Sequence, residues 1–434
     1  MTYKYSDLLA AKYMGLSTYP TSKVAHKICL VVIKRILKHE KRLRARRAKD
    51  QATFEVAVGR IIGDLLISAS KDGAGWAYRS VSKKSFTEIS IKGDTFNIIM
   101  NSLCELGDVE KMIGGNRKNV FATDATNSFY PGIATRFKAT EALLSMCQGH
   151  GLGIAQVKKH FKRRPSLKEI RLKASSSRAL GRKLNGRAMK VEQTYVTEAI
   201  RGRLLEVNRF LVEQNYKGTE FYGLRRIFNE GDHPSFKWNQ GGRLYGVGEE
   251  NYQLLKKAQR RKIKINGEAV VELDINASYL RILHGMRGFP LPTRKDIYAI
   301  TGLSRALVKA WISATLGHTT FHRAWPPRSL ADLKKAGVVV GSKMTYPGLM
   351  PKVLAHFPVL QDWPDCGVRW SSLMYEEAEA MMSAMETLKS EGVVALPVHD
   401  SLIVPKSHGP LAARIIKETF EQRFSVDFVV SGLK

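Results

Sequence analysis

The chain has 434 residues and a formal net charge of +31, with 44% hydrophobic and 9% aromatic residues. This composition excludes a disordered chain, and the length suffices for two or three domains with a substantial core. The cysteines contain no Cys-x-x-Cys pair, which argues against a structural zinc site and against a disulfide framework; they are Cys29, Cys104, Cys147 and Cys366.

The positive charge is densest in the first 200 residues and favours a polyanionic partner, with nucleic acid as the default. A basic protein without such a partner is the alternative. No apolar run reaches the length of a membrane span, and no signal-peptide pattern opens the chain. We therefore expect a soluble cytoplasmic protein that does not engage a membrane; the sequence does not define its oligomeric state.

Residues 21–49 show a helical pattern whose second half is crowded with lysine and arginine. Like charges on adjacent turns destabilise a helix unless an anion screens them, which suits a phosphate backbone. A solvated basic face is the alternative. A second, amphipathic helix over residues 52–69 is expected to pack beneath the first, so residues 1–80 are predicted to form a basic helical region.

Residues 81–150 alternate between strand and helix patterns. We predict strands at 86–92, 108–113 and 132–138 and helices at 95–106 and 139–148. A helix followed by a hairpin with a polar tip is the plan of a winged helix, with Arg117 and Lys118 in the wing. Winged helices bind duplex DNA or serve as protein contacts, and the sequence leaves both roles open.

Residues 151–190 combine many basic side chains with Pro165, a run of serines and several glycines. This pattern predicts an exposed basic linker. Helical periodicity resumes over residues 191–214.

The most informative stretch, residues 270–283, is an apolar strand that ends in Asp274 and is followed by a helical pattern. A second acid, Asp400, lies at the tip of a hairpin predicted over residues 393–405, before a helix at 410–424 and a strand at 426–431. Two carboxylates side by side repel each other unless divalent cations lie between them, and paired cations can clamp the oxygens of a phosphoryl transfer. We predict that these two acids share a metal site, although singly a helix N-cap and a turn residue are the simpler explanations.

Four motifs, in this order, resemble those of family A DNA polymerases, whose relatives include the single-subunit RNA polymerases. Residues 240–244 with 251–254 resemble the block that enters the palm, and residues 273–283 resemble the first palm motif. Residues 305–309 have the Arg-x-x-x-Lys spacing of the fingers helix, and residues 398–401 resemble the third palm motif. The ordered set covers roughly the last half of the chain.

The resemblance implies an α+β fold of the right-hand polymerase type: a palm with an antiparallel sheet, and helical fingers and thumb. A mostly helical N-terminal region, with the winged-helix-like module, would precede it. The polymerase core would span residues 191–434, with the thumb at about 191–240, the palm at 241–290 and 365–434, and the fingers at 291–364.

The resemblance also assigns roles to single residues. Asp274, Asp400 and the backbone carbonyl of Ile275 would bind two Mg²⁺ ions, or Mn²⁺ in their place. Arg305 and Lys309, which lie four apart on one helical face, would bind the phosphates of the incoming nucleotide.

Tyr279 occupies the sugar-gate position, where a bulky side chain crowds a 2′-hydroxyl and favours deoxynucleotides; a packing tyrosine is the alternative. Arg243 and His399 would contact the primer end. Arg226 lies in a stretch that mixes basic and aromatic residues, a pattern that suits strand stacking or an ordinary core. Arg281 is expected to pack within the palm.

The sequence departs from the family pattern at two positions. Ser313 stands where the fingers helix usually presents an aromatic side chain, and Trp311 or His318 is the expected substitute. Ser401 stands where many family A members have a second acid. The single-subunit RNA polymerases also have serine at this position.

The expected function is a template-directed DNA polymerase without proofreading that serves a phage, plasmid or other mobile element. Its partners would be a DNA primer–template duplex and deoxynucleoside triphosphates. Two alternatives stay open. A single-subunit RNA polymerase or primase is permitted by Ser401 and opposed by Tyr279. A non-catalytic DNA-binding replication initiator with a degenerate palm is suggested by Ser313, Gly317 and Ser401.

Overall fold

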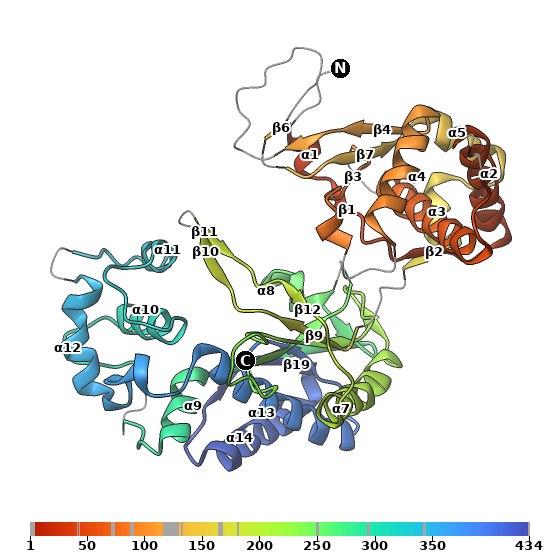
Figure 1. Ribbon diagram of the computed structural model, residues 1–434. Helices are drawn as coiled ribbons and strands as arrows, with labels where there is room; N and C mark the ends of the chain where they lie inside the picture. The colour runs from red at the N-terminus through yellow and green to blue at the C-terminus, as the bar shows by residue number, and fades with distance from the viewer. Residues whose placement is uncertain are drawn as a thin grey trace. The chain divides into compact units, whose positions relative to one another are not determined.

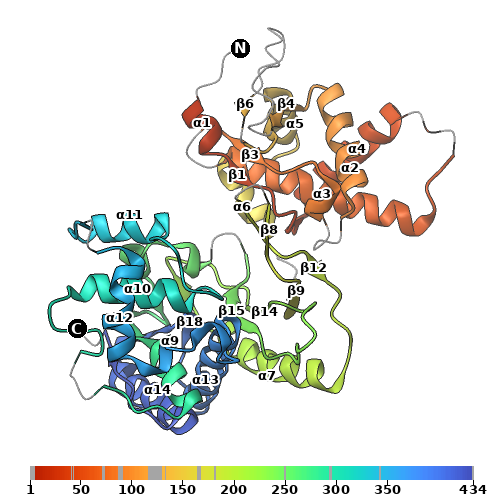
Figure 2. The same ribbon diagram turned by 60° about the vertical axis from the view of Figure 1, so that its left-hand side comes forward.

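The computed structural model describes residues 5–40, 42, 44–70, 74–86, 91–115, 130–131, 133–163, 168–179, 182–248, 251–292, 296–341 and 344–432. The protein is a mixed α+β structure with several small sheets (Figures 1 and 2). It divides into two compact units, Met1–Ser166 and Leu167–Lys434. No helix in the described ranges combines the length and the apolar character needed to cross a bilayer.

The first unit is built around α3 (Ala48–Ala69), which packs against α2 (Lys23–Glu40) and α4 (Gly93–Glu105). Its four-stranded sheet has the order β1 (Lys12–Tyr13), β3 (Trp76–Tyr78), β7 (Arg136–Ala139), β4 (Val109–Met112), with only β1 and β3 parallel. The remaining elements are α1 (Tyr5–Leu9), β2 (Thr18–Pro20), β5 (Gly114–Gly115), β6 (Tyr130–Pro131), α5 (Glu141–Gly149), α6 (Val157–His160) and β8 (Phe161–Arg163).

The sequence predicted a boundary at residue 80 within this unit, but residues from both sides of it pack into one core. Most of the circumference of α3 is apolar and buried, so it needs partners on several sides and draws them from both predicted parts. The helix and hairpin expected at 95–138 are present as α4, β4 and β7. The strand expected at 86–92 is absent where the structure describes it, since Lys83–Phe86 is a 3₁₀ turn, and Arg117 and Lys118 lie outside the described residues.

The basic helix expected over residues 21–49 is shorter than predicted, because α2 ends at Glu40. Arg46 folds back onto both carboxylate oxygens of Glu40, at 2.6 Å each, and its guanidinium lies 3.9 Å from the centre of the Phe54 ring. The arginine therefore stabilises the connection between α2 and α3 instead of extending a helical basic face.

The described residues of the second unit form a four-stranded sheet, a six-stranded sheet and a small two-stranded one. The first has the order β12 (Ala188–Met189), β9 (Ile170–Lys173), β14 (Leu224–Phe228), β15 (Gly241–Gly246). The second has the order β13 (Tyr216–Lys217), β16 (Lys264–Ile265), β17 (Glu268–Ile275), β19 (Ser401–Pro405), β18 (Leu396–Val398), and β20 (Val430–Ser431) also pairs with β17. The segment predicted as a linker thus supplies strands, because β9 pairs in parallel with β14, and it also carries the hairpin β10 (Ser177–Ala179) and β11 (Arg182–Leu184).

Helices cover these sheets. The longest, α13 (Trp370–Ser390), packs on β15 and against α7 (Tyr195–Val212), α9 (Ser278–Arg287) and α14 (Gly409–Phe424). Helices α13 and α14 lie side by side, and α10 (Arg305–Leu316), α11 (Pro327–Lys335) and α12 (Tyr346–His356) form a separate helical group (Figures 1 and 2). A short helix, α8 (Lys257–Arg260), precedes β16. The helix predicted over 410–424 is confirmed by α14, whereas the last strand is shorter than predicted.

A close approach in the first unit generates a test of its core. A Cβ atom on Gly63 would overlap the Thr18 side chain and lie 2.9 Å from Cδ1 of Phe161, whereas on Gly59, one helical turn away, it would meet only Pro20 at 3.4 Å. We expect Gly63→Ala to lower the free energy of unfolding by about 1–3 kcal/mol through overpacking. Gly59→Ala should be neutral or stabilise by up to about 1 kcal/mol through helix propensity. Urea unfolding of the full chain measures both, and equal effects would contradict this packing.

Candidate functional site

The pairing of β17 with β19 brings two distant acids to one edge of the sheet. Asp274, near the end of β17, is opposite Ser401, and the amide of Ile275 donates to the carbonyl oxygen of Asp400 at 3.1 Å. Asp400 lies in the tight turn between β18 and β19, where His399 adopts a left-handed conformation with φ of 57°. Both strands of this hairpin are fully buried, so the turn has a rigid base.

Both acids line a single open cavity of about 450 Å³, together with side chains from other parts of the second unit. We call it the two-acid cavity. Besides the two acids, its lining includes five residues to which the resemblance assigns roles: Ile275, Tyr279, Arg305, Lys309 and Arg243. The others lining it are Asn276, Ala277, Tyr298, Ser313, Gly317, Glu377 and Ser431.

The electrostatics of this cavity suit a divalent cation. Burial raises the pKa of the Asp274 carboxyl, and the neighbouring Asp400 raises it further, while Lys257 and Lys309 oppose the shift. A hard cation that takes oxygen ligands would relieve this repulsion, and Mg²⁺ needs only one or two carboxylates when waters and phosphate oxygens complete its shell. No cluster of three or more His, Cys, Asp or Glu side chains suited to a metal occurs in the described part of the chain. The two acids therefore form a sparse donor set of the kind that Mg²⁺ with a phosphate ligand accepts.

Two cations of the cavity, Arg305 and Lys309, come from α10, and a third, Arg243, comes from β15. Ser304 caps this helix by accepting from the amide of Leu307, and Arg305 and Lys309 follow on one face. Nε of Arg305 lies 2.6 Å from Oδ2 of Asp296, and its guanidinium is 5.3 Å from the Tyr298 ring centre. Within the described residues Lys309 forms no ion pair, so its charge faces the cavity.

Glu377, on α13, is a site residue that the sequence reasoning missed. It is 1% exposed and accepts from Nη2 of Arg243 at 2.6 Å and from the hydroxyl of Ser278 at 2.8 Å. Burial raises the pKa of Glu377, and Asp400 adds to the rise, whereas Arg243 counteracts it. The available signal was its position on the apolar face of a helix that also presents Leu373 and Met381, where an acid needs a partner.

Arg243 links this buried acid to Tyr279. Its guanidinium lies 5.5 Å from the centre of the Tyr279 ring, in cation–π range. The expected contact of Arg243 with primer DNA is untested, but its charge is already paired with Glu377 and its side chain is 18% exposed. His399 is adjacent to Asp400 and packs edge-on to Tyr245 at 6.3 Å; burial and then Arg243 lower its pKa, so it is neutral at pH 7.

Three predicted residues, His399, Arg226 and Arg281, do not line the two-acid cavity. Arg226 is 2% exposed, pairs with Glu379 at 2.5 Å and donates to the carbonyl oxygen of Gly242. Its partner on α13 buries the charge, which argues against the predicted contact with primer or template and favours the ordinary core that the sequence also allowed. Arg281 packs as expected, donating to the carbonyl oxygens of Asn276 and Asp427.

The missing aromatic of the fingers motif is not replaced as expected. Trp311 is fully buried and stacks on Tyr346 at 4.9 Å, and His318 does not line the two-acid cavity. Tyr298 provides an aromatic ring in the lining instead, while Ser313 and Gly317 leave that side of the cavity open.

No protein-family model matches the chain, and no curated protein matches its sequence. Among solved structures, the chain is similar to the POL domain of Pol1 from M. smegmatis, in complex with DNA primer–template and dNTP, at 15% identity and a TM-score of 0.29. The match covers 54% of this chain and 51% of that one, so the chain spans about half the length of its neighbour. A TM-score of this size does not establish a common fold.

The raised pKa of Asp274 predicts a pH-dependent effect on stability. A carboxyl whose pKa is higher in the folded than in the unfolded protein opposes folding once it is ionised, fully above the folded pKa and not at all below the unfolded value of about 3.9. We expect Asp274→Asn to raise the melting temperature at pH 7 in chelator-treated buffer, by a margin that shrinks toward pH 4. Thermal unfolding at a series of pH values measures this margin.

Asp232 provides the control of opposite sign. Its carboxylate accepts from the amide and hydroxyl of Ser175, at 2.7 and 2.8 Å, and these bonds lower its pKa. Asp232→Asn should leave the melting temperature unchanged or lower it. A decrease at pH 7 on replacing Asp274 would contradict the proposed crowding of charge.

Proposed function

We propose that this protein is a template-directed DNA polymerase that adds deoxynucleotides to a primer 3′ end. The observation that supports the proposal best is the two-acid cavity itself, which combines Asp274 and Asp400 with Arg305 and Lys309. Nucleotidyl transfer needs both features: acids that hold cations at the reacting oxygens and cations that hold the triphosphate.

In the proposed mechanism, Asp274, Asp400 and the carbonyl of Ile275 would hold two Mg²⁺ ions, whose chemistry would be to lower the pKa of the primer hydroxyl and to offset charge on the leaving pyrophosphate. Arg305 and Lys309 orient the triphosphate, so that its α-phosphorus faces the hydroxyl. Tyr279, held by Arg243, fills the space beside the sugar and disfavours a 2′-hydroxyl.

The proposal extends to the wider role of the chain. The polymerase would lack proofreading, since the sequence before residue 240 offers no nuclease-like acidic motif. The basic first unit would bind DNA, with the duplex as the natural ligand of its helix and hairpin. The chain is small for a polymerase and carries a fused DNA-binding-like module, and from these two features we infer that it serves a phage, plasmid or other mobile element.

A second candidate is an RNA polymerase or primase. Ser401 favours it, since the single-subunit RNA polymerases that the third motif resembles also carry serine there. In this structure the Ser401 hydroxyl donates to the carbonyl oxygen of Val398 at 2.9 Å, a contact that stabilises the turn whatever sugar is used.

The direct test is primer extension with Mg²⁺ on DNA and RNA templates. We expect Asp274→Ala and Asp400→Asn each to lower the extension rate by about 10²-fold or more, since each removes charge stabilisation at the reacting oxygens. Asp332→Asn is the matched control, because Asp332 is an exposed acid on α11 that pairs only loosely with Lys335 at 3.7 Å. Equal extension by wild type and Asp274→Ala would refute the proposal, and DNA binding that survives without any extension would favour a non-catalytic initiator.

The choice of sugar is tested separately at Tyr279. We expect Tyr279→Ala to raise the ratio of ribonucleotide to deoxynucleotide incorporation by about tenfold or more, because the space for a 2′-hydroxyl opens. Tyr298→Phe, which keeps the neighbouring ring, is the control. Single-nucleotide incorporation with matched dNTP and NTP measures the ratio, and a wild type that already prefers NTPs would support the RNA polymerase or primase.

A further inference from the structure

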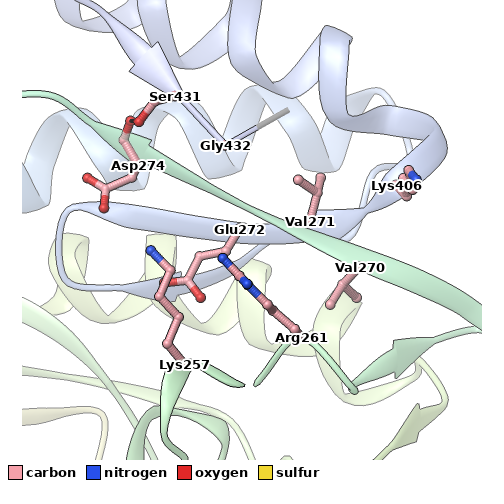
Figure 3. A pocket seen from close by; sticks show the side chains of 9 residues that line it. All are labelled: Lys257, Arg261, Val270, Val271, Glu272, Asp274, Lys406, Ser431 and Gly432. Atoms are coloured by element: carbon pink, nitrogen blue, oxygen red, sulfur yellow. Dashed lines mark hydrogen bonds between the residues drawn. The ribbon is translucent and has the colours of Figure 1, made fainter. Parts of the chain in front are cut away.

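A second cavity lies along β17 and shares Asp274 and Ser431 with the two-acid cavity. Its volume is about 400 Å³, and we call it the basic cavity (Figure 3). Lys257 and Arg261, from the region of α8, and Lys406, from the turn after β19, line it together with Glu272 and Asp274 of β17.

The charge of the basic cavity is not balanced by its acids. Glu272 is already paired with the neighbouring Arg260, whose Nη2 lies 2.7 Å from Oε1. Within the described residues, no ion pair involves Lys257, Arg261 or Lys406, and all three side chains are exposed. With Arg260, four cations therefore surround two carboxylates, which leaves two positive charges for a ligand.

The backbone fixes the wall of the cavity beside Asp274. Gly432 adopts φ of 119°, and a Cβ atom there would overlap the carbonyl oxygen of Glu272. Only glycine allows this approach, which holds β20 against β17 and keeps the cavity next to the acid.

The position of the basic cavity identifies the chemistry of its ligand. Separate exposed lysine and arginine side chains bind phosphate oxygens, and Lys257 lies near Asp274 in the view of Figure 3. The cations on α10 line the other cavity, so the basic cavity is a second phosphate-binding region beside the same acid. We propose that it binds a phosphate group next to Asp274, either of the nucleic-acid strand or of released pyrophosphate; this inference rests on the proposed function.

The test replaces two of the three cations that line the basic cavity and leaves Lys257, whose charge acts on Asp274, in place. Arg261→Gln combined with Lys406→Gln removes two positive charges from the cavity. Lys262→Gln combined with Lys264→Gln removes the same charge from nearby exposed lysines that do not line it. Arg261→Lys combined with Lys406→Arg keeps the charge and should restore binding, and thermal unfolding checks that all three proteins are folded.

Two binding measurements distinguish the sources of phosphate without depending on catalysis. If the ligand is the strand, the first double variant should bind a primer–template duplex about tenfold more weakly than the control, with the salt dependence reduced by about one to two ions. If the ligand is pyrophosphate, its affinity measured by calorimetry should fall about tenfold while duplex affinity stays at the control value. A variant that matches its control in both measurements would overturn the inference.

These outcomes separate this inference from the proposed function. A wild-type protein that extends primers, with variants that bind like the control, would leave the polymerase proposal standing and remove the phosphate site. Selective loss of duplex or pyrophosphate binding in the variants of a protein that never extends a primer would support the phosphate site and remove the polymerase proposal.

Discussion

The structure of the second unit depends on the antiparallel pairing of β17 with the hairpin β18–β19. This pairing fixes two carboxylates at one edge of a sheet, where burial and the neighbouring Asp400 raise the pKa of Asp274. Proteins tolerate such crowding where a ligand relieves it, so strained electrostatics of this kind mark sites of function. The buried strands of the hairpin keep the acids from moving apart, and the repulsion is therefore retained in the folded chain.

The parts of the fold that the sequence predicted are those whose periodicity is local. The apolar strand before Asp274, the hairpin around Asp400 and the helix α14 each follow from a pattern within about fifteen residues. Because hydrophobic alternation also sets which face of a strand is buried, it was enough to place the acids at strand ends. It was not enough to show what lies across from them.

The errors share one cause, which is a partner distant in sequence. The stretch around Arg226 suited strand stacking or an ordinary core, and only the structure shows that Glu379 on α13 buries its charge. Glu377 escaped notice because its partners, Arg243 and Ser278, belong to other elements. The segment predicted as a linker contains β9, a four-residue strand that pairs with β12 and, across a longer stretch of sequence, with β14. Such pairings arise from tertiary structure, and local composition does not encode them.

The ion pair between Arg305 and Asp296 has a consequence for how the two-acid cavity selects its ligand. The guanidinium is held in place through Nε by a carboxylate of the same unit, so an incoming anion competes with that carboxylate for the guanidinium. Binding there is an exchange of one anion for another, and a ligand with a single carboxylate gains little over the group it replaces. A polyphosphate has several oxygens, which reach Lys309 as well, so it gains from the exchange. The ion pair therefore favours ligands that carry several negative charges over ligands that carry one.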